Sequence, residues 1–120
     1  MVLVDTSVWV DHFRHGDQQL ARSLEDGLVL IHPFVLGEIA CGNLQKRTRI
    51  LSDLQALPLA VSAQHAEVMH LLERHKLYGS GLSWIDVHLL ASALLSHCRL
   101  WTLDARLAHA AATLRLRYSG

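Results

Sequence analysis

The chain has 120 residues, of which 51% are hydrophobic and 18% are charged, a composition typical of one folded domain and not of a disordered chain. Eleven Lys and Arg residues balance eleven Asp and Glu residues, which on its face argues against a nucleic-acid binder, but the net charge alone does not decide the question. No apolar run could span a bilayer, and the start MVLVDTSVW lacks the basic region of a secretion signal. We therefore expect a single domain over residues 1–120, located in the cytoplasm. Because the cytosol keeps thiols reduced, Cys41 and Cys98 are expected to be buried thiols and not a disulfide.

Short apolar runs alternate with helical patterns along the chain. In chain order we predict a strand over 2–5, helices over 7–14 and 18–26, a strand over 28–31, helices over 34–41 and 46–54, a strand over 57–61, a helix over 63–75, a loop over 78–82, a helix over 84–97, a strand over 99–102, a helix over 105–114 and a strand over 115–118. Pro33 suits the start of a helix and Gly27 the end of one. Ser62 and Ser83 are the expected caps of the helices that follow them.

Apolar strands separated by helices predict a parallel sheet that is covered on both faces. We expect a three-layer α/β/α fold, doubly wound, with a central parallel sheet of about four to five strands flanked by helices. Residues 85–95 are apolar nearly all round, so that helix should be buried against the sheet or against another subunit.

Two acidic residues follow predicted strands. Asp5 ends the first strand, and Asp104 follows the strand over 99–102, in the sequence LWTLD. Because ligands of an open parallel sheet bind beyond the carboxyl ends of its strands, both residues are directed to the same rim. Asp86, in the first turn of the long apolar helix, and Glu38, in the helix after the second strand, could also reach that rim, although the sequence does not force it.

Gathered carboxylates repel one another, and a divalent cation removes that conflict. Acids without nearby His or Cys ligands suggest Mg²⁺ or Mn²⁺, which prefer oxygen, and a phosphoester substrate. Each acid also has a structural interpretation. Asp5 could begin a helix, Asp104 could cap one, Asp86 stands at capping-box spacing from Ser83, and Glu38 could be a solvated helix residue. The combination in an alternating α/β frame favours a site.

Four segments together resemble the VapC-like PIN-domain proteins: MVLVDTSVWVDHFR, PFVLGEIACG, GLSWIDVHLLASALL and LWTLDARLAHAA. They follow in the expected order at similar spacing over essentially the whole chain. The resemblance implies a small PIN-like nuclease that cleaves single-stranded or looped RNA with Mg²⁺ or Mn²⁺. It also implies the toxin of a VapBC toxin–antitoxin system, a VapB-like antitoxin partner and a homodimer.

The resemblance also implies roles for individual residues. By motif, Asp5, Asp86 and Asp104 are expected to be metal-binding catalytic acids, and Glu38 to bind a second metal ion or to act through a water. Ser7 is expected to hydrogen-bond a site carboxylate or a metal-bound water. The implied reaction is attack of a metal-activated water on an RNA phosphodiester, which leaves a 5′-phosphate and a 3′-hydroxyl.

Basic and aromatic residues leave alternatives open. Arg14, Lys46, Arg47 and Arg106 are candidate RNA-phosphate contacts, although the basic stretch around Lys46 could also be a solvated helix face or contact an acidic partner segment. The three tryptophans, at positions 9, 84 and 101, favour core or interface packing over base stacking. The histidines at 65, 70 and 75 are five residues apart and do not share a helix face, which disfavours a histidine metal site.

Two other enzyme classes fit the sequence less well than the nuclease. A haloacid-dehalogenase-like phosphatase needs a second acid two residues after Asp5, where the chain has Ser7. A receiver-type domain expects adjacent early acids and a late lysine, but no lysine follows Lys76. A non-catalytic PIN-fold interaction module and a housekeeping RNA-processing nuclease remain open as alternatives.

Overall fold

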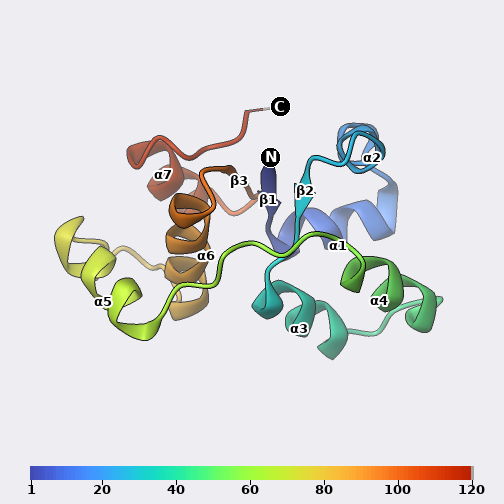
Figure 1. Ribbon diagram of the computed structural model, residues 1–120, viewed down its shortest axis with the longest axis horizontal. Coiled ribbons are helices and arrows are strands. Elements are labelled where there is room, and N and C mark those ends of the chain that lie inside the picture. Colours follow the sequence, from blue (N-terminus) through green and yellow to red (C-terminus); the bar gives the residue numbers. More distant parts are fainter. Residues whose placement is uncertain (120) are drawn as a thin grey trace.

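A computed structural model of the protein describes residues 1–119, so residue 120, the last of the expected domain, lies outside the described residues. Three parallel strands form the sheet, β1 (Val2–Val4), β2 (Val29–Leu30) and β3 (Arg99–Trp101), in the order β2-β1-β3 (Figure 1). The helices are α1 (Thr6–His15), α2 (Gln18–Glu25), α3 (Pro33–Cys41), α4 (Arg47–Gln55), α5 (His65–Arg74), α6 (Trp84–Leu95) and α7 (Ala105–Thr113).

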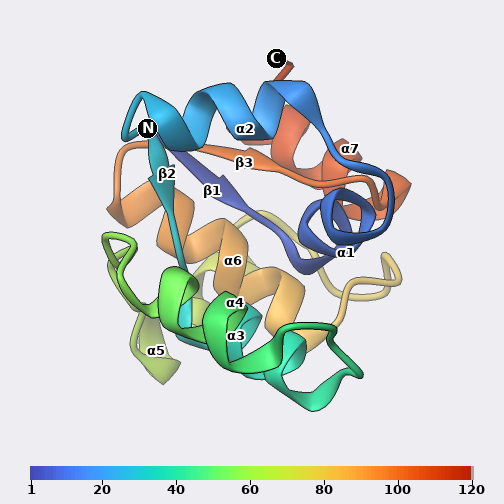
Figure 2. The same cartoon turned by 90° about the vertical axis from the view of Figure 1, so that its right-hand side faces the viewer.

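The helices lie on both sides of the small sheet. In Figure 1, α5, α6 and α7 lie on one side of the strands, and α1 to α4 lie on the other. Figure 2 shows α2 above the strands and α6 running below them. Parallel strands need crossover connections, and helices supply them here, which gives the α/β/α layering that the sequence predicts.

The core forms where these layers meet. Leu3 on β1, Leu89 and Leu90 on α6, Leu100 on β3 and Leu107 on α7 have no exposed surface. Every residue of α6 from 87 to 93 is buried, which confirms that this apolar helix packs heavily inside the molecule. Each fully buried leucine stabilises the fold by about 1.5–3 kcal/mol.

Two predicted strands are reduced to single bridges. Residues 57–61 contribute only the bridge between Leu59 and Ile31, and residues 115–118 only the bridge between Arg117 and Leu100. The Ile31 N–H donates to the Pro58 carbonyl, and the Ala60 N–H donates to the Ile31 carbonyl. Pro58 has no N–H with which to extend this pairing. The described sheet therefore has three strands, fewer than predicted.

Helix α5 begins two residues later than predicted, and the expected Ser62 cap is wrong. Gln64 is the N-cap residue, and its backbone N–H donates to the Glu67 carboxylate at 2.8 Å. A Glu three residues into the helix satisfies the cap backbone, which fixes the start here. The Ser83 cap of α6 is confirmed, because its hydroxyl accepts the Asp86 N–H at 3.1 Å.

The two cysteines are both free, as expected, but only Cys98 is buried, and Cys41 at the end of α3 is exposed.

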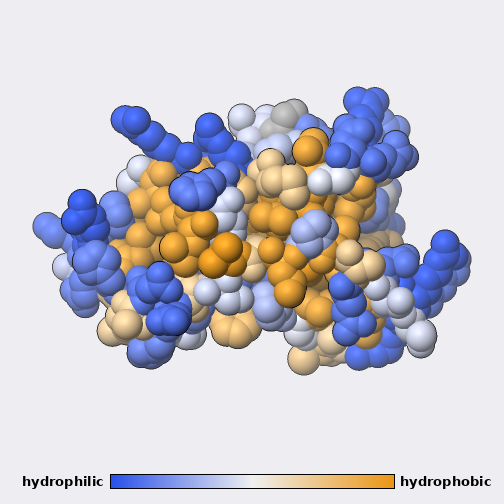
Figure 3. Space-filling model, in the orientation of Figure 1, coloured by the Kyte–Doolittle hydropathy of each residue, from blue (hydrophilic) through white to orange (hydrophobic). Residues whose placement is uncertain are grey.

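Apolar side chains gather across the middle of one face of the molecule, over α6 and the segment that crosses toward α5 (Figure 3). Leu59, Val61, Leu94 and Leu95 are exposed members of the large apolar set. Among residues 1–119, no helix is both long and apolar enough to cross a membrane.

Candidate active site

Asp5 stands at the end of the central strand of the sheet. Since β1 lies between β2 and β3, the chain winds in opposite directions from it, and an open parallel sheet binds ligands at such a point. The Asp5 N–H donates to the Trp101 carbonyl at 2.9 Å, which continues the pairing of Val4 with Trp101. The strand register therefore places Asp5 beside the residues that follow β3.

Two hydroxyls hold the carboxylate of Asp5. Ser7 Oγ donates to Asp5 Oδ2 at 2.8 Å, and Thr102 Oγ1 donates to the same oxygen at 2.7 Å. Each hydroxyl in turn accepts a backbone N–H at 3.0 Å, from Leu103 at Ser7 and from Asp104 at Thr102. Because their lone pairs accept these N–H groups, both hydroxyl protons are free to point at Asp5.

Asp5 does not serve as a helix cap. It occupies the N-cap position of α1, yet its side chain accepts no N–H from that helix. Asp5 is only 8% exposed, and a buried carboxylate is costly unless it is compensated. Of the four acids, Asp5 is therefore the one that a purely structural role explains least.

Asp104 lies at the same end of the sheet and has two roles open to it. Its Oδ1 accepts the Arg106 N–H at 2.9 Å and the Leu107 N–H at 3.0 Å, so it caps α7. Its own N–H bonds the Thr102 hydroxyl that holds Asp5. The capping interpretation of Asp104 is therefore correct, and the cap uses one carboxylate oxygen.

Glu38 is connected to the same region through α1. Thr6 Oγ1, next to Asp5 in the chain, donates to Glu38 Oε1 at 2.8 Å. Glu38 is exposed on α3, so the hydrogen bond orients a side chain that solvent can reach. The structure thus places Glu38 near the end of β1, which the sequence did not force.

Asp86 is held by its capping box. Its Oδ2 accepts the Ser83 N–H at 3.0 Å while its own N–H donates to the Ser83 hydroxyl. Among residues 1–119, no hydrogen bond joins Asp86 to the other three acids. The loop before α6 does approach the start of α7, since a Cβ built on Gly81 would lie 2.7 Å from Arg106 Nη1.

The four carboxylates share one feature that suits a cation. Across the described residues, each accepts hydrogen bonds through a single oxygen and leaves the other without a donor. None of them forms a salt bridge, because the pair recorded in residues 1–119 joins Arg49 to Asp53. Four anionic oxygens without a cationic partner form a set of hard donors of the kind that Mg²⁺ and Mn²⁺ bind.

The acids do not form a closed cage. Within residues 1–119, no three His, Cys, Asp or Glu side chains lie close enough together to enclose a metal ion. A magnesium ion keeps several of its waters and usually takes only one or two carboxylates directly. The donor set therefore fits a hydrated divalent ion better than a dehydrated structural one.

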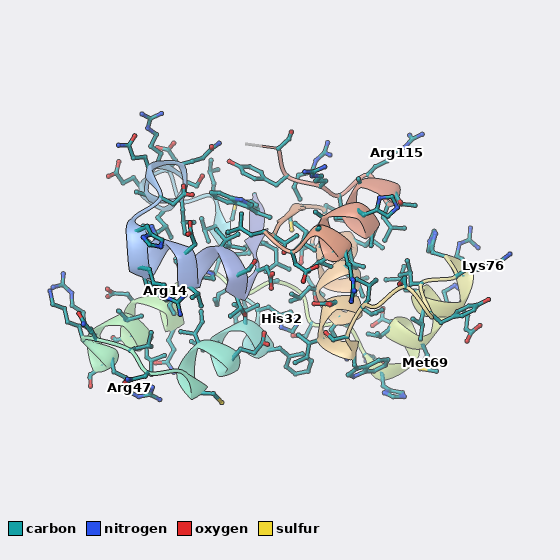
Figure 4. The ribbon with its side chains drawn as sticks, turned by 180° about the vertical axis from the view of Figure 1, so that it is seen from behind. Arg14, His32, Arg47, Met69, Lys76 and Arg115 are labelled. Carbon is teal, nitrogen blue, oxygen red and sulfur yellow. The ribbon has the colours of Figure 1, made fainter. Side chains whose placement is uncertain are left out.

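The four predicted basic residues differ in how close they lie to the acids. Arg106 packs against Gly81, close to the rim. Figure 4 shows Arg14 and Arg47 on the α1 and α4 side of the molecule. Arg47 donates to the carbonyls of Ala40 and Gly42, so it closes the end of α3. Lys46 is exposed and precedes α4 in a left-handed conformation.

Sequence reasoning missed Thr102. The signal was a hydroxyl residue between a strand and Asp104 in LWTLD, at the level where β3 pairs beside Asp5.

We expect Thr102→Val to remove the hydroxyl at nearly constant volume and to weaken Mn²⁺ binding by about 10–100-fold, because it loosens a positioned carboxylate. Calorimetric titration of Mn²⁺ measures this loss. Thr102→Ser should restore affinity, and equal affinity of Thr102→Val and the parent would remove Thr102 from the site.

A cluster of rings lies between the start of α3 and α6. Figure 4 shows His32 where the start of α3 comes near α6. Its Nδ1 accepts the Phe34 N–H at 2.9 Å, while its Nε2 is buried with no partner among the described residues. Burial, and then the nearness of His88, lowers the pKa of His32 to about 4, so this ring is neutral at pH 7.

Comparison with known proteins agrees with the fold. The profile of the PIN domain family matches residues 2–113. Ribonuclease VapC32 of Mycobacterium tuberculosis, from strains CDC 1551 / Oshkosh and H37Rv, is 42% identical over 113 residues, which cover 93% of this chain and 91% of the relative. The crystal structure of PAE2754 from Pyrobaculum aerophilum matches with a TM-score of 0.60 and 18% identity, covering 90% of this chain and 77% of that one.

The chain therefore belongs to the PIN-domain family. Because it is 42% identical in sequence to Ribonuclease VapC32 over nearly the full length of both chains, it is a VapC-like member of that family. The resemblance to the VapC-like PIN-domain proteins is confirmed, and so is the expected α/β fold class.

Proposed function

We propose that this protein is the toxin of a VapBC-type toxin–antitoxin system and acts as a Mg²⁺- or Mn²⁺-dependent endoribonuclease. The observation that carries the metal dependence is the set of four carboxylates, each with one oxygen free of hydrogen bonds and none in a salt bridge within residues 1–119. Similarity to Ribonuclease VapC32 supports RNA as the substrate.

In this mechanism Asp5, Asp86 and Asp104 would bind the hydrated ion, one or two of them directly and the others through its waters, and Glu38 would bind a second ion or contact the first through a water. The bound ion would acidify a water and neutralise charge that develops on the phosphate. Ser7 and Thr102 keep the Asp5 carboxylate in one orientation through their hydrogen bonds to Oδ2, which leaves Oδ1 without a donor among residues 1–119 and able to bind a cation. Ser83 and the first turn of α7 fix Asp86 and Asp104 in the same manner.

Partners and location are part of this proposal. A VapB-like antitoxin would cover the enzyme, and a second copy of the chain would form a homodimer. The exposed apolar side chains of Leu59, Val61, Leu94 and Leu95 support an interface on that face. Residues 1–120 would form a single PIN-like domain. The free thiols of Cys41 and Cys98 suit the reducing cytoplasm.

Metal removal tests the function directly. We expect the purified protein to cleave single-stranded RNA with Mg²⁺ or Mn²⁺, to lose cleavage in EDTA, and to recover it when excess Mn²⁺ is added. End analysis should give 5′-phosphate and 3′-hydroxyl termini, because water is the nucleophile. Cleavage that persists in EDTA would contradict the metal dependence. A non-catalytic module would show neither cleavage nor Mn²⁺ binding in a calorimetric titration.

A further inference from the structure

A row of four aromatic rings connects α3, α6 and α5. Phe34 lies 4.8 Å from His88, His88 lies 4.9 Å from Trp84, and Trp84 lies 5.1 Å from His65, measured between ring centroids. We call these four residues the ring surface. Neighbouring rings meet edge to face or tilted, so they support one another without hiding both faces of each ring.

The two large apolar rings of this surface are exposed. Phe34 and Trp84 each show 40% of their surface to solvent, whereas Trp9 shows 2%. Trp101 is half-buried and packs against Tyr118 with the ring centroids 4.7 Å apart. Trp84 is therefore not in the core, and of the two expected alternatives only interface packing stays open for it. Exposed apolar side chains that form a contiguous patch mark a binding surface more often than scattered ones do.

The ring surface adjoins one of the acids through the geometry of α3. Phe34 and Glu38 are four residues apart on this helix, so their side chains lie on the same helix face. Trp84 and Asp86 both stand in the first turn of α6, but they are two residues apart and therefore point to different sides of the helix. An RNA chain that reaches Glu38 along α3 would pass over Phe34, and His88 connects the Phe34 ring to Trp84.

We propose that the ring surface stacks unpaired bases of single-stranded RNA next to the phosphate that is cleaved. This inference rests on the proposed ribonuclease function and adds how the substrate is held. Every base has a flat face, and exposed aromatic side chains bind such faces with little dependence on sequence. A stem of paired bases would not offer those faces, so the ring surface would also favour single-stranded over double-stranded RNA.

A second copy of the chain is the less suitable occupant. Two half-exposed rings offer little area, whereas a stable interface buries about 800 Å² on each partner. The larger exposed apolar group, with Leu94 and Leu95, lies at the opposite end of α6 from Trp84 and is better placed for a dimer. Three features thus favour RNA bases: the chemistry of the rings, the small exposed area, and the position of Phe34 on the same helix face as Glu38.

Binding of a fluorescent single-stranded oligoribonucleotide in EDTA tests the proposal. The parent is the full chain with Asp5→Asn, which prevents cleavage. Phe34→Leu and Trp84→Leu keep apolar bulk and remove the ring, and each should weaken binding about tenfold or more. Trp84→Phe should restore affinity to within a few-fold. Leu28→Met is the matched control, because Leu28 is 43% exposed but precedes β2, at the opposite end of the sheet from the acids, and it should bind like the parent.

The same oligoribonucleotide with abasic positions separates stacking from phosphate contacts. The parent should bind the abasic strand about as weakly as Trp84→Leu binds the intact strand. The affinity of Trp84→Leu should be nearly the same for both strands. If Trp84→Leu binds both strands like the parent, the inference is wrong. If Trp84→Leu changes the protein from dimer to monomer in sedimentation and leaves RNA binding unaltered, the ring surface is a subunit contact. That outcome would also overturn the inference.

Cleavage by the chain without Asp5→Asn distinguishes failure of this inference from failure of the function. If that chain cleaves RNA and Trp84→Leu cleaves with the same KM, the ribonuclease stands and the ring surface does not bind substrate. If it neither cleaves nor binds RNA with Mn²⁺, the ribonuclease function fails, and the ring-surface inference fails with it.

Discussion

Asp5→Asn should abolish metal-dependent RNA cleavage, lowering kcat/KM by about two to three orders of magnitude, or about 3–4 kcal/mol of transition-state stabilisation. The physical reason is the removal of the negative charge at the centre of the site. Asn keeps the size of Asp, and its carbonyl oxygen can still accept the hydroxyls of Ser7 and Thr102. The free energy of unfolding should therefore stay within about 1 kcal/mol of the parent.

The measurement combines cleavage of a labelled RNA in Mn²⁺ with urea unfolding. Asp26→Asn is the matched control, because it makes the same chemical change at an exposed residue that ends α2, and it should leave both quantities unchanged. Parent-like cleavage by Asp5→Asn would reject Asp5 as a metal ligand. A large fall in unfolding free energy would show that Asp5 is chiefly structural.

Asp104 requires a comparison that separates its cap from its charge. Asp104→Asn should lower cleavage about a hundredfold or more, about 3 kcal/mol, with little change in stability, because Asn caps helices as well as Asp does. Asp104→Ala should lose the same activity and also destabilise the protein by about 1 kcal/mol, since the N–H groups of Arg106 and Leu107 lose their acceptor.

Thermal unfolding and RNA cleavage of both variants decide between the roles. Activity that is lost in Asp104→Asn at unchanged stability identifies the charge as the functional property. If Asp104→Asn cleaves normally and only Asp104→Ala is impaired, Asp104 is a helix cap and not a metal ligand.

Much of the fold could be predicted because it depends on local patterns. The strands that begin at Val2 and Arg99 are short apolar runs, and Pro33 and Ser83 mark helix starts through backbone chemistry that acts within a few residues. The segments over 57–61 and 115–118 have the same composition as strands. Whether they pair depends on a partner edge distant in the chain, and each makes only one bridge.

By itself, the sequence determined that acidic residues follow two parallel strands and therefore point to one rim, because strand direction in an α/β chain leaves no other arrangement. Only the tertiary structure decided how each acid is held. Thr102, which follows β3, donates to Asp5, and Thr6 donates to Glu38. Within residues 1–119, one oxygen of each of the four site carboxylates accepts no hydrogen bond. These contacts join residues up to 97 positions apart, and no local pattern encodes a hydrogen bond across that distance. The exposure of Trp84 has the same origin, since the packing of α3, α5 and α6 determines which ring faces stay open.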